Sequence, residues 1–569
     1  MKKATFVLLG VVACGEPEPS LSSSGGNGAS VGGRRAKAGA ALTGTSVLQL
    51  GDGRAAVADP DSDSVFLVTP SGHATLQFPE GSQPTRTAVA GRDLAVVLRG
   101  SGQIARLKAT QRNARVDGAS LLTACAEVRG VAHDPATNGL KIACGGGELV
   151  TLDGQGRHVV DTGLELRDVM VFEGKTWATT FRSAELVELD AQGHVVTRLA
   201  PPRLPVSGVT FSPRVAWRAV ADGPRVVMVH QLHVDDEVTK LTNPAAGAPY
   251  YGRPYCQASV VSSALTVFDL QSKTMVWSAP IVGALPVDVA VTPAKVAVAF
   301  AGAGNVLEYA VNGFERPAAG GGCLVPETTG LSPAPTGVGY VEDKLAYFDR
   351  TGVVRGDFVP VPGDAVVPER VQPVERSVFH AQSPSGVSCA SCHPEGHEDG
   401  HTWRFGARVV RSQSLEGGLL ATAPFHWDGS LRNLDAVMNE TMVLRMGGAR
   451  ADTSTVAALE RWLDALPARA APETVDPVEA KRGHAAFEAS GCNVCHAGAA
   501  LTNGSTVDVG TGGPFQVPSL KGVGRRGPWL HDGCARTLEQ RFDPACGGAN
   551  HGTVPAADVP FVVAYLKTL

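Results

Sequence analysis

Apolar and polar positions alternate along the chain from about Val47 to Gly352. Short alternating runs flank tight turns rich in Gly, Asp or Ser, which is the pattern of β-hairpins. Successive units are 36 to 49 residues apart, with one interval of about 70. The seven units begin near Ala55, Leu94, Leu140, Thr176, Arg225, Lys295 and Gly337. Repeats of this length, each supplying a small antiparallel sheet, predict an all-β, seven-bladed β-propeller over residues 47–352.

The long interval falls in the fifth unit and contains an insertion from roughly Asp235 to Ser262. The same unit contains His230 and His233, which raise the question of a metal site. Strand alternation puts the two on different or shifted faces. We therefore favour the alternative, a polar interior of the propeller.

The pattern changes after Gly352. A Val- and Pro-rich connector runs to about Phe379, and two units of similar sequence follow, which we place at residues 353–478 and 479–569. The first unit ends in TVAALERWLDAL and the second in DVPFVVAYLKTL, where apolar residues recur at spacings of three and four. This spacing predicts an amphipathic helix at the end of each unit.

The first residues indicate export. Two lysines precede an apolar run from Ala4 to Ala13, which is too short to span a bilayer. The segment ending at Cys14 is similar to a bacterial lipobox, in which the cysteine is acylated, and residues 1–13 would then be a lipoprotein signal peptide. An ordinary secretory signal is the alternative. Residues 14–46 form a Gly- and Ser-rich stretch typical of a flexible tether.

These features predict a lipid-anchored protein of the cell envelope, periplasmic or surface-exposed. Gly15 after the lipid cysteine favours the outer membrane. The formal net charge is −5, with 55 acidic and 50 basic residues. Nothing in this balance indicates nucleic-acid binding.

Two C-x-x-C-H motifs carry the main chemical information, one at Cys389–His393 and one at Cys492–His496. The motif is the attachment signal for c-type haem, in which two thiols bind the porphyrin covalently and the histidine becomes the proximal iron ligand. One copy alone could be a redox dithiol or half of a zinc site. Two copies in an exported chain predict two covalently attached haem c groups. The predicted attachment and iron-binding residues are Cys389, Cys392, His393, Cys492, Cys495 and His496.

Six cysteines remain after the haem thiols and Cys14 are set aside, and export permits disulfides. Proximity in sequence favours three pairs: Cys125–Cys144, Cys256–Cys323 and Cys534–Cys546. Six cysteines allow fifteen pairings, so this choice follows locality alone.

The two C-terminal units share further sequence. Pro424 aligns with Pro528, and Asp428-Gly429 aligns with Asp532-Gly533. The segments TAPFHWDGSLRNL and VPSLKGVGRRGPWLHDGCARTLEQ resemble the paired signatures of the bacterial dihaem cytochrome c peroxidase (MauG-like) family, over roughly residues 370–569. The N-terminal repeats resemble the YVTN-like and WD40-like propellers fused to bacterial c-type cytochromes.

The resemblance implies two mostly helical, class I-like cytochrome c domains. It also implies one haem that receives electrons and one at which peroxide is reduced. Trp427 corresponds to the inter-haem tryptophan of the family, and His531 to the histidine near a haem propionate. Asp532 and Arg536 would position the propionate or the loop. We therefore expect Trp427 and His531 to take part in catalysis.

The chain departs from the family at the distal ligands. The family's methionine beyond the H-D-G motif is Ala545 here, and no methionine follows Met446. His551 is our candidate for the sixth ligand of the second haem, with an open site or a surface histidine as alternatives. For the first haem, alignment favours Met446 over Met442, and either could instead be core packing.

Three further residues near the first motif stay open. His397 and His401 follow the proximal histidine closely enough to coordinate, although simple exposure is the alternative. The family's acid–base glutamate corresponds to Gly447, and Glu440 lies nearby in sequence, where it could equally be a helix-surface charge.

The sequence thus favours a membrane-anchored dihaem oxidoreductase that reduces hydrogen peroxide with electrons from an external redox protein. One alternative is a non-enzymatic electron-transfer cytochrome with two six-coordinate haems. In the other, the propeller binds a polymer or a protein while the haems pass current or sense redox state.

Overall fold

The computed structural model describes residues 44–109, 113–206, 209–238, 259–311, 323–358, 372–472, 475–547 and 551–569. The predicted signal peptide, Cys14 and nearly all of the predicted tether lie outside these residues, and so does Cys256. The described residues all belong to one compact unit.

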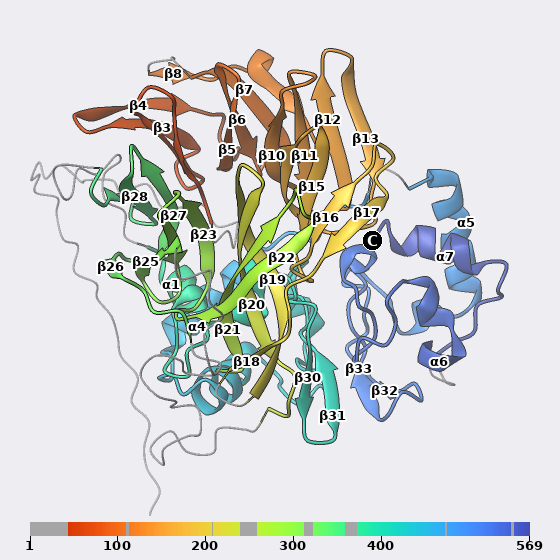
Figure 1. The fold of residues 1–569 in the computed structure, drawn as a ribbon. Helices are drawn as coiled ribbons and strands as arrows, with labels where there is room; N and C mark the ends of the chain where they lie inside the picture. The colour runs from red at the N-terminus through yellow and green to blue at the C-terminus, as the bar shows by residue number, and fades with distance from the viewer. Residues whose placement is uncertain are drawn as a thin grey trace, which may run out of the picture. The chain divides into compact units, whose positions relative to one another are not determined.

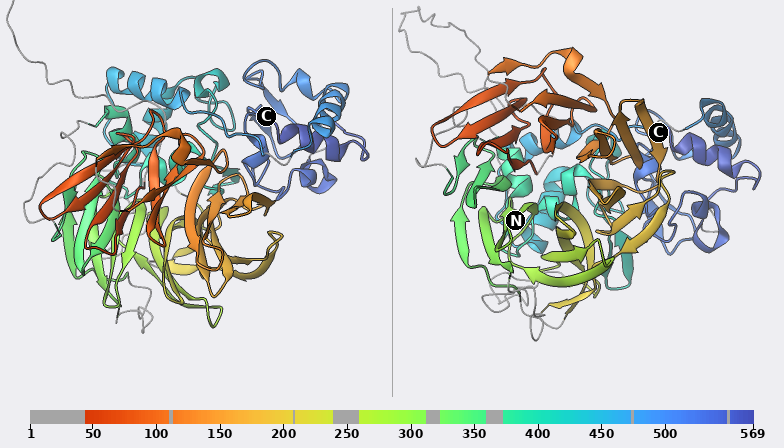
Figure 2. Two further views of the ribbon diagram at one scale, coloured as in Figure 1. Left: turned by 90° about the horizontal axis from the view of Figure 1, so that it is seen from above. Right: turned by 45° about the horizontal axis from the view of Figure 1, so that its top comes forward.

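Seven mainly antiparallel sheets follow one another along the chain and confirm the predicted seven-bladed propeller (Figure 1). The right-hand view of Figure 2 shows these sheets, coloured red to green, arranged around a common centre. Blades 1 to 3 contain β1 (Val47–Gln49), β2 (Ala55–Asp59), β3 (Ser64–Thr69), β4 (Gly72–Gln77) and β8 (Ala114–Arg115); β5 (Pro84–Ala90), β6 (Asp93–Leu98), β7 (Gln103–Lys108) and β9 (Leu121–Thr123); and β10 (Val128–Asp134), β11 (Gly139–Cys144), β12 (Glu148–Asp153) and β13 (Gly156–Asp161).

Blades 4 to 7 are the next four sheets along the chain, and blade 7 has three strands in the described part of the chain. Blades 4 to 7 contain β14 (Leu166–Phe172), β15 (Lys175–Thr180), β16 (Leu186–Leu189) and β17 (Val195–Leu199); β18 (Leu204–Val206), β19 (Val209–Asp222), β20 (Arg225–Val234), β21 (Val261–Asp269) and β22 (Thr274–Ile281); β23 (Pro286–Val291), β24 (Lys295–Phe300), β25 (Asn305–Ala310) and β26 (Thr328–Leu331); and β27 (Pro335–Val341), β28 (Lys344–Asp349) and β29 (Val354–Arg355).

The predicted hairpins occur at the predicted places. In blade 1, for example, Val57 of β2 lies opposite Phe66 of β3. Strand β2 of blade 1 is buried along its whole length. Burial on both faces explains why several strands read as continuous apolar runs, because each blade packs between two others.

Blade 5 is extended on the side of the C-terminal region. Strands β19 and β20 are 14 and 10 residues long, longer than the strands of the other blades. The predicted insertion begins where β20 ends and continues to β21, and its residues 239–258 lie outside the described residues.

The ring closes between the first and last blades. Thr45 N–H donates to the carbonyl of Thr336 over 2.7 Å, and the two side-chain hydroxyls lie 3.2 Å apart. One apolar cluster spans the junction and includes Val57, Phe66, Val341 and Phe348. β1 pairs with β2 of blade 1, so closure depends on contacts between blades and not on a shared strand.

The C-terminal region is only partly helical. Its helices are α1 (Val374–His380), α2 (Cys389–Cys392), α3 (Leu434–Val437), the π-helix η6 (Met438–Arg445), α4 (Thr453–Asp464), α5 (Pro477–Ala489), α6 (Pro544–Gly547) and α7 (Val559–Leu566). Short 3₁₀ turns are η4 (Pro394–Gly396), η5 (Leu419–Thr422), η7 (Cys492–Val494), η8 (Val523–Arg525) and η9 (Glu539–Phe542), and two small hairpins are β30 (Thr402–Phe405) with β31 (Arg408–Arg411) and β32 (Thr506–Asp508) with β33 (Pro514–Gln516).

Each predicted unit pairs an early helix with a late one. In the first, α1 packs on α4, where Phe379 and Trp462 make an edge-to-face contact with ring centroids 5.1 Å apart. In the second, α5 crosses α7 so closely that Gly483 faces the backbone of Phe561. The long stretches between these helices are loops, turns and hairpins, so the prediction of two mostly helical class I-like domains is not confirmed beyond this helix pairing.

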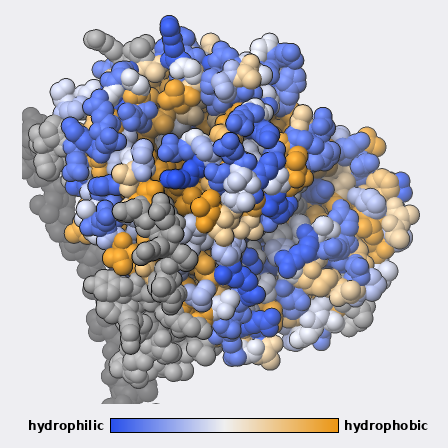
Figure 3. Space-filling view, in the orientation of Figure 1, coloured by the Kyte–Doolittle hydropathy of each residue, from blue (hydrophilic) through white to orange (hydrophobic). Residues whose placement is uncertain are grey.

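Two of the predicted disulfides are present: Cys125–Cys144 and Cys534–Cys546. The third predicted pair includes Cys256, which lies outside the described residues. Within the described part of the chain, no helix has the length and apolar character needed to cross a bilayer. On the face drawn in Figure 3, hydrophilic side chains cover most of the described surface, with smaller apolar patches among them.

Candidate functional site

The first C-x-x-C-H motif forms one helical turn, α2. Ser388 precedes it and forms a capping box with Ser391, whose hydroxyl accepts a hydrogen bond from the Ser388 N–H over 3.0 Å. The His393 N–H donates to the carbonyl of Cys389 over 2.9 Å. Residues three and four positions apart on such a turn share a face. The turn therefore presents both thiols and the imidazole to the same side.

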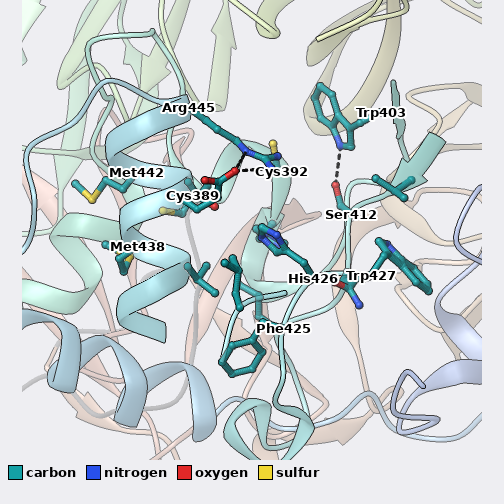
Figure 4. A pocket seen from close by; sticks show the side chains of 18 of the residues that line it. Cys389, Cys392, Trp403, Ser412, Phe425, His426, Trp427, Met438, Met442 and Arg445 are labelled. Carbon is teal, nitrogen blue, oxygen red and sulfur yellow. Dashed lines mark hydrogen bonds and ion pairs between the residues drawn. The ribbon is translucent and has the colours of Figure 1, made fainter. Parts of the chain in front are cut away.

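That side is a cavity of about 730 Å³. Its wall contains Cys389, Cys392 and His393 together, and apolar side chains from α1, α3 and α4 complete it. Figure 4 shows the two thiols, His426 and Phe425 among the side chains that line the cavity. The wall also contains Arg408, Arg411 and Arg445.

The π-helix η6 supplies a second wall. Met438 and Met442 of this helix are among the residues that line the cavity, and so is Met446, which follows the helix. Glu440 lines it too and pairs with Arg445 over 3.1 Å. From the sequence, Glu440 could be either an acid–base group or a charge on the helix surface, and the structure places it at the cavity.

His426 is a residue that the sequence reasoning missed. It lines the cavity beside Trp427, and its backbone is left-handed with φ of 65°. Burial lowers its pKa, so the imidazole is favoured in its neutral form. Its position directly before the W-D-G signature was the one available signal, and in the second unit the matching position holds Leu530.

Burial dominates the ionisation of the first motif. It lowers the pKa of His393 to about 4 and raises the pKa of Cys389 to about 11. Burial also raises the pKa of Cys392 well above its usual range. Neutral imidazole is the form that coordinates iron, and protonated thiols are inert towards stray oxidation until they react.

These residues fit haem c. Two thiols and one imidazole reach the same largely apolar cavity, and its arginines suit the carboxylates of porphyrin propionates.

The second motif also begins as one turn, η7, which Gly491 enters in a left-handed conformation with φ of 71°. Its histidine is oriented by the backbone: His496 Nδ1 lies 3.3 Å from the carbonyl oxygen of Leu501. A proximal histidine typically donates Nδ1–H to such a carbonyl, which leaves Nε2 for the iron. Burial lowers the pKa of His496. Cys492 is half-buried, and Val494 between the two thiols is exposed.

The two units meet at Trp427 and His531. Their ring centroids are 6.2 Å apart, and Phe515 of β33 stacks on His531 with a centroid separation of 3.9 Å. Trp427 Nε1–H donates to the carbonyl of Arg411 over 2.7 Å, and the Arg411 N–H donates to the carbonyl of His531 over 2.6 Å. The sequence placed these two aromatic residues in separate repeats, and the fold brings them into one cluster.

The aligned repeats share an unusual backbone. Ala423-Pro424 and Gly527-Pro528 are both cis, and His426 and Leu530 both have positive φ, at 65° and 68°. In each repeat an isolated bridge then closes the turn, from Phe425 to Leu431 and from Trp529 to Ala535. The sequence alignment therefore corresponds to a repeated local structure. The neighbouring Asp532 accepts from the Cys534 N–H over 3.0 Å, and Arg536 is exposed.

The other histidines near the first motif are not at the cavity. His397 and His401 are buried, at 6% and 3% exposed, and among the described residues neither lines it. His397 Nδ1 lies 2.7 Å from Glu416, and His401 Nε2 donates to the carbonyl of Val234. The expectation that these histidines are exposed is therefore wrong, and their contacts indicate a role in packing against the propeller instead of coordination of the first haem.

The two propeller histidines form polar contacts inside the protein. His230 Nε2 lies 2.8 Å from the hydroxyl of Thr266, and His233 Nδ1 lies 3.4 Å from Asp399. Both rings are fully buried. No group of three or more metal-ligating side chains occurs among the residues that the structure describes.

In the second unit, His551 precedes α7, and its carbonyl accepts a hydrogen bond from Arg541. Ala545, at the family's methionine position, is exposed and adjoins Cys546. The disulfide to Cys534 ties this position to the H-D-G loop. Whether His551 is the distal ligand stays a prediction.

Comparison with known proteins supports the resemblance. No family model matches the chain. "Methylamine utilization protein MauG" of Methylorubrum extorquens is 27% identical over 290 residues, which cover 38% of this chain and 82% of that protein. Among solved structures, a chain of hydrazine synthase from Kuenenia stuttgartiensis is 23% identical with a TM-score of 0.30, covering 33% of this chain and 83% of that one. Virginiamycin B lyase from Staphylococcus aureus is 8% identical with a TM-score of 0.35, and the match covers 54% of this chain and 92% of that one.

Proposed function

We propose that this chain, a seven-bladed propeller joined to a MauG-like region, is a dihaem c-type cytochrome that reduces hydrogen peroxide. At the level of the family, the likeness to MauG supports a peroxidase-like oxidoreductase with c-type haems. The observation that carries the proposal is the cavity whose wall unites Cys389, Cys392 and His393. A second group would be held by Cys492, Cys495 and His496.

Haem c, when bound, supplies an iron that exchanges electrons and that binds small oxidants where an axial position is open. The chain's own contribution begins with a proton. Glu440 is held at the cavity wall by Arg445, with 3.1 Å between carboxylate and guanidinium. A carboxylate fixed at this place can take a proton from one oxygen of a peroxide and return it to the other.

The second contribution is a route for electrons between the two halves of the site. Trp427 is held rigidly by its hydrogen bond to the Arg411 carbonyl, and its ring lies against the Phe515–His531 pair. Closely packed aromatic rings shorten the distance over which an electron must pass through saturated chain. We assign Trp427 and His531 to this route, with the second unit receiving electrons from an external redox protein.

The proposal includes location. The lipobox-like segment that ends at Cys14 supports acylation of that cysteine, and the tether that follows supports a protein held at a membrane of the cell envelope. Replacing Cys14 by Ser should release the protein from membrane pellets into the soluble fraction and abolish incorporation of labelled fatty acid. Unchanged membrane association would contradict the anchor.

A second candidate function is favoured by one observation. Met438, Met442, Met446 and His426 all line the first cavity, so the chain offers several side chains that can close the axial position. With both irons closed, the protein would be an electron carrier without peroxidase activity. The propeller would then serve as a module that binds a partner.

The test is to count haems and probe their axial sites in the full chain, matured in a host with a c-type cytochrome assembly system. Wild type should carry two covalent haems by mass, and the double variants Cys389→Ala/Cys392→Ala and Cys492→Ala/Cys495→Ala one each. A high-spin EPR signal that peroxide converts supports the enzyme. Two low-spin signals that peroxide leaves unchanged support the carrier, and the absence of covalent haem contradicts both.

The role of Glu440 has its own test. Glu440→Gln keeps the side-chain volume but removes the proton-transfer group, and it should lower the peroxide-dependent rate by about two orders of magnitude. Glu479→Gln, an exposed residue of α5, is the matched control. Equal rates in both variants would remove Glu440 from the mechanism.

A further inference from the structure

The segment directly after the first proximal histidine is both highly charged and buried. We call residues 394–401 the docking segment; it reads PEGHEDGH. Glu395, Glu398 and Asp399 are 6%, 0% and 0% exposed. Three acidic side chains in five residues are removed from water only where other charges or donors replace the water.

Glu395 obtains its partners from three different blades. Its carboxylate lies 2.5 Å from Arg99 after β6, 3.4 Å from Arg129 on β10 and 2.9 Å from Arg167 on β14. Blades 2, 3 and 4 therefore each direct one guanidinium at a single carboxylate of the C-terminal region.

The remainder of the docking segment continues across the propeller. Glu398 lies 3.0 Å from Arg182 in the β15–β16 turn of blade 4. Asp399 lies 3.4 Å from His233 of blade 5, and His401 Nε2 donates to the carbonyl of Val234 at the end of β20 over 3.0 Å. Four neighbouring blades thus hold a segment of eight residues.

The arrangement is specific for this segment. Within the described part of the chain, Arg99 and Arg167 form ion pairs with Glu395 alone. Arg167 is buried and also lies over the ring of Phe181, at 4.8 Å from its centroid. Without Glu395, buried guanidinium groups of like charge would face one another with less compensation, which is strongly unfavourable.

We propose that the propeller is the outer wall of the first haem site and that Glu395 is the positioning residue through which it acts. Glu395 is two residues from His393, so the propeller fixes the turn that sets the direction of the proximal imidazole. The balance between Glu395 and its arginines also sets part of the electric field at the first iron. The inference rests on the proposed haem binding, and it gives the propeller a role in tuning the cytochrome.

The test compares the first haem's reduction potential and low-temperature EPR spectrum in full-length variants that retain two haems. Glu395→Gln removes a negative charge and leaves the arginines less compensated. This disfavours ferric iron, so the potential of the first haem should rise. Arg99→Gln removes one cation and should lower it. Glu395→Asp keeps the charge and should restore most of the wild-type potential while altering the EPR signal of the displaced imidazole.

The matched control is Asp168→Asn. Asp168 pairs with Arg218 over 2.5 Å inside the propeller, and among the described residues it forms no ion pair with the docking segment. It should leave the first haem's EPR signal as in wild type, and the second haem is the internal reference in every variant. The variant Cys492→Ala/Cys495→Ala, which lacks the second haem, assigns the signals.

Opposite shifts for Glu395→Gln and Arg99→Gln, confined to the first haem, support the inference. Shifts of the same sign, equal shifts at both haems, or wild-type values in both variants overturn it. If Glu395→Gln does not accumulate as folded protein, Arg99→Gln and Glu395→Asp decide, because Arg99 is partly exposed and the aspartate keeps the charge. Loss of covalent haem in wild type would instead refute the proposed function.

Discussion

The crossing of α5 and α7 gives a sharp prediction at Gly483. A Cβ atom at this position would lie 1.8 Å from the carbonyl oxygen of Phe561 and 2.9 Å from the Cβ atom of Tyr565. Neither contact can be relieved by rotating a flexible side chain, because one is backbone and the other is the first atom of a side chain. Gly483→Ala must therefore separate the two helices.

The magnitude follows from two opposing terms. Alanine favours a helix interior over glycine by about 1 kcal/mol. Overpacking in a tight core costs about 1–3 kcal/mol and more where backbone is displaced. Here the helices are forced apart around Phe487, Val562 and Val563, which are buried at the crossing. We expect the overlap to prevail, with a net destabilisation of the second unit of about 2 kcal/mol.

The assay is hydrogen exchange of the α5 and α7 peptides in the full chain, because a multidomain protein does not unfold in a single two-state step. Amide protection of both helices should fall by about 30-fold for 2 kcal/mol, while propeller peptides stay unchanged. The control is Gly154→Ala, where the added Cβ meets nothing within 4 Å. Equal or greater protection of α5 in Gly483→Ala would refute the close crossing.

Three other predictions concern charge, cross-linking and electron flow. Burial opposes ionisation of Glu398, but buried arginines outweigh this effect and lower the pKa of its carboxyl to about 2. The stability that this carboxylate contributes is present above the unfolded pKa and is lost as the pH falls towards 2. Glu398→Gln should therefore remove on the order of 3 kcal/mol at pH 7 and flatten the acid side of the plot of unfolding free energy against pH, and an unchanged acid side would contradict this. Joint replacement of Cys125 and Cys144 by Ala opens a link across 19 residues and should destabilise the propeller by about 3 kcal/mol in thermal unfolding; an unaltered transition would show that the disulfide adds nothing. Trp427→Phe should slow electron exchange between the haems in stopped-flow measurements. Trp403→Phe is the control: it loses a hydrogen bond to Ser412 in the same cavity and should not change the rate. Equal rates in both variants would exclude Trp427 as the route.

Much of the propeller could be predicted because its signal is local. The runs that became β2 and β3, or β20 and β21, alternate within a few residues of a turn, and neighbouring residues decide a hairpin. Cys125 and Cys144 were matched for the same reason, since they are close in sequence. The two attachment motifs are local as well, because one turn of chain brings thiols and imidazole to one side.

The cavity depended on contacts that sequence does not reveal. Glu440 belongs at the first site because η6 turns it towards α2, some fifty residues earlier in the chain. Glu395 and Arg99 are separated by 296 positions, and no periodic pattern marks either. His397 and His401 were open to coordination on sequence grounds, but the carboxylate of Glu416 and the backbone of blade 5 offered them nearer partners.

The junction between the last and first blades has a mechanical consequence. α1 follows blade 7, and next to it the side-chain amide of Gln372 donates to the carbonyl of Arg350 in that blade, while Arg376 lies 2.8 Å from Asp61 of blade 1. The start of the C-terminal region thus bridges the junction between blades 7 and 1, which are not consecutive in the chain. Opening the propeller at this junction would break the contacts of α1 with both blades. A displacement of blade 7 against blade 1 would therefore move the helix whose Phe379 lines the first cavity.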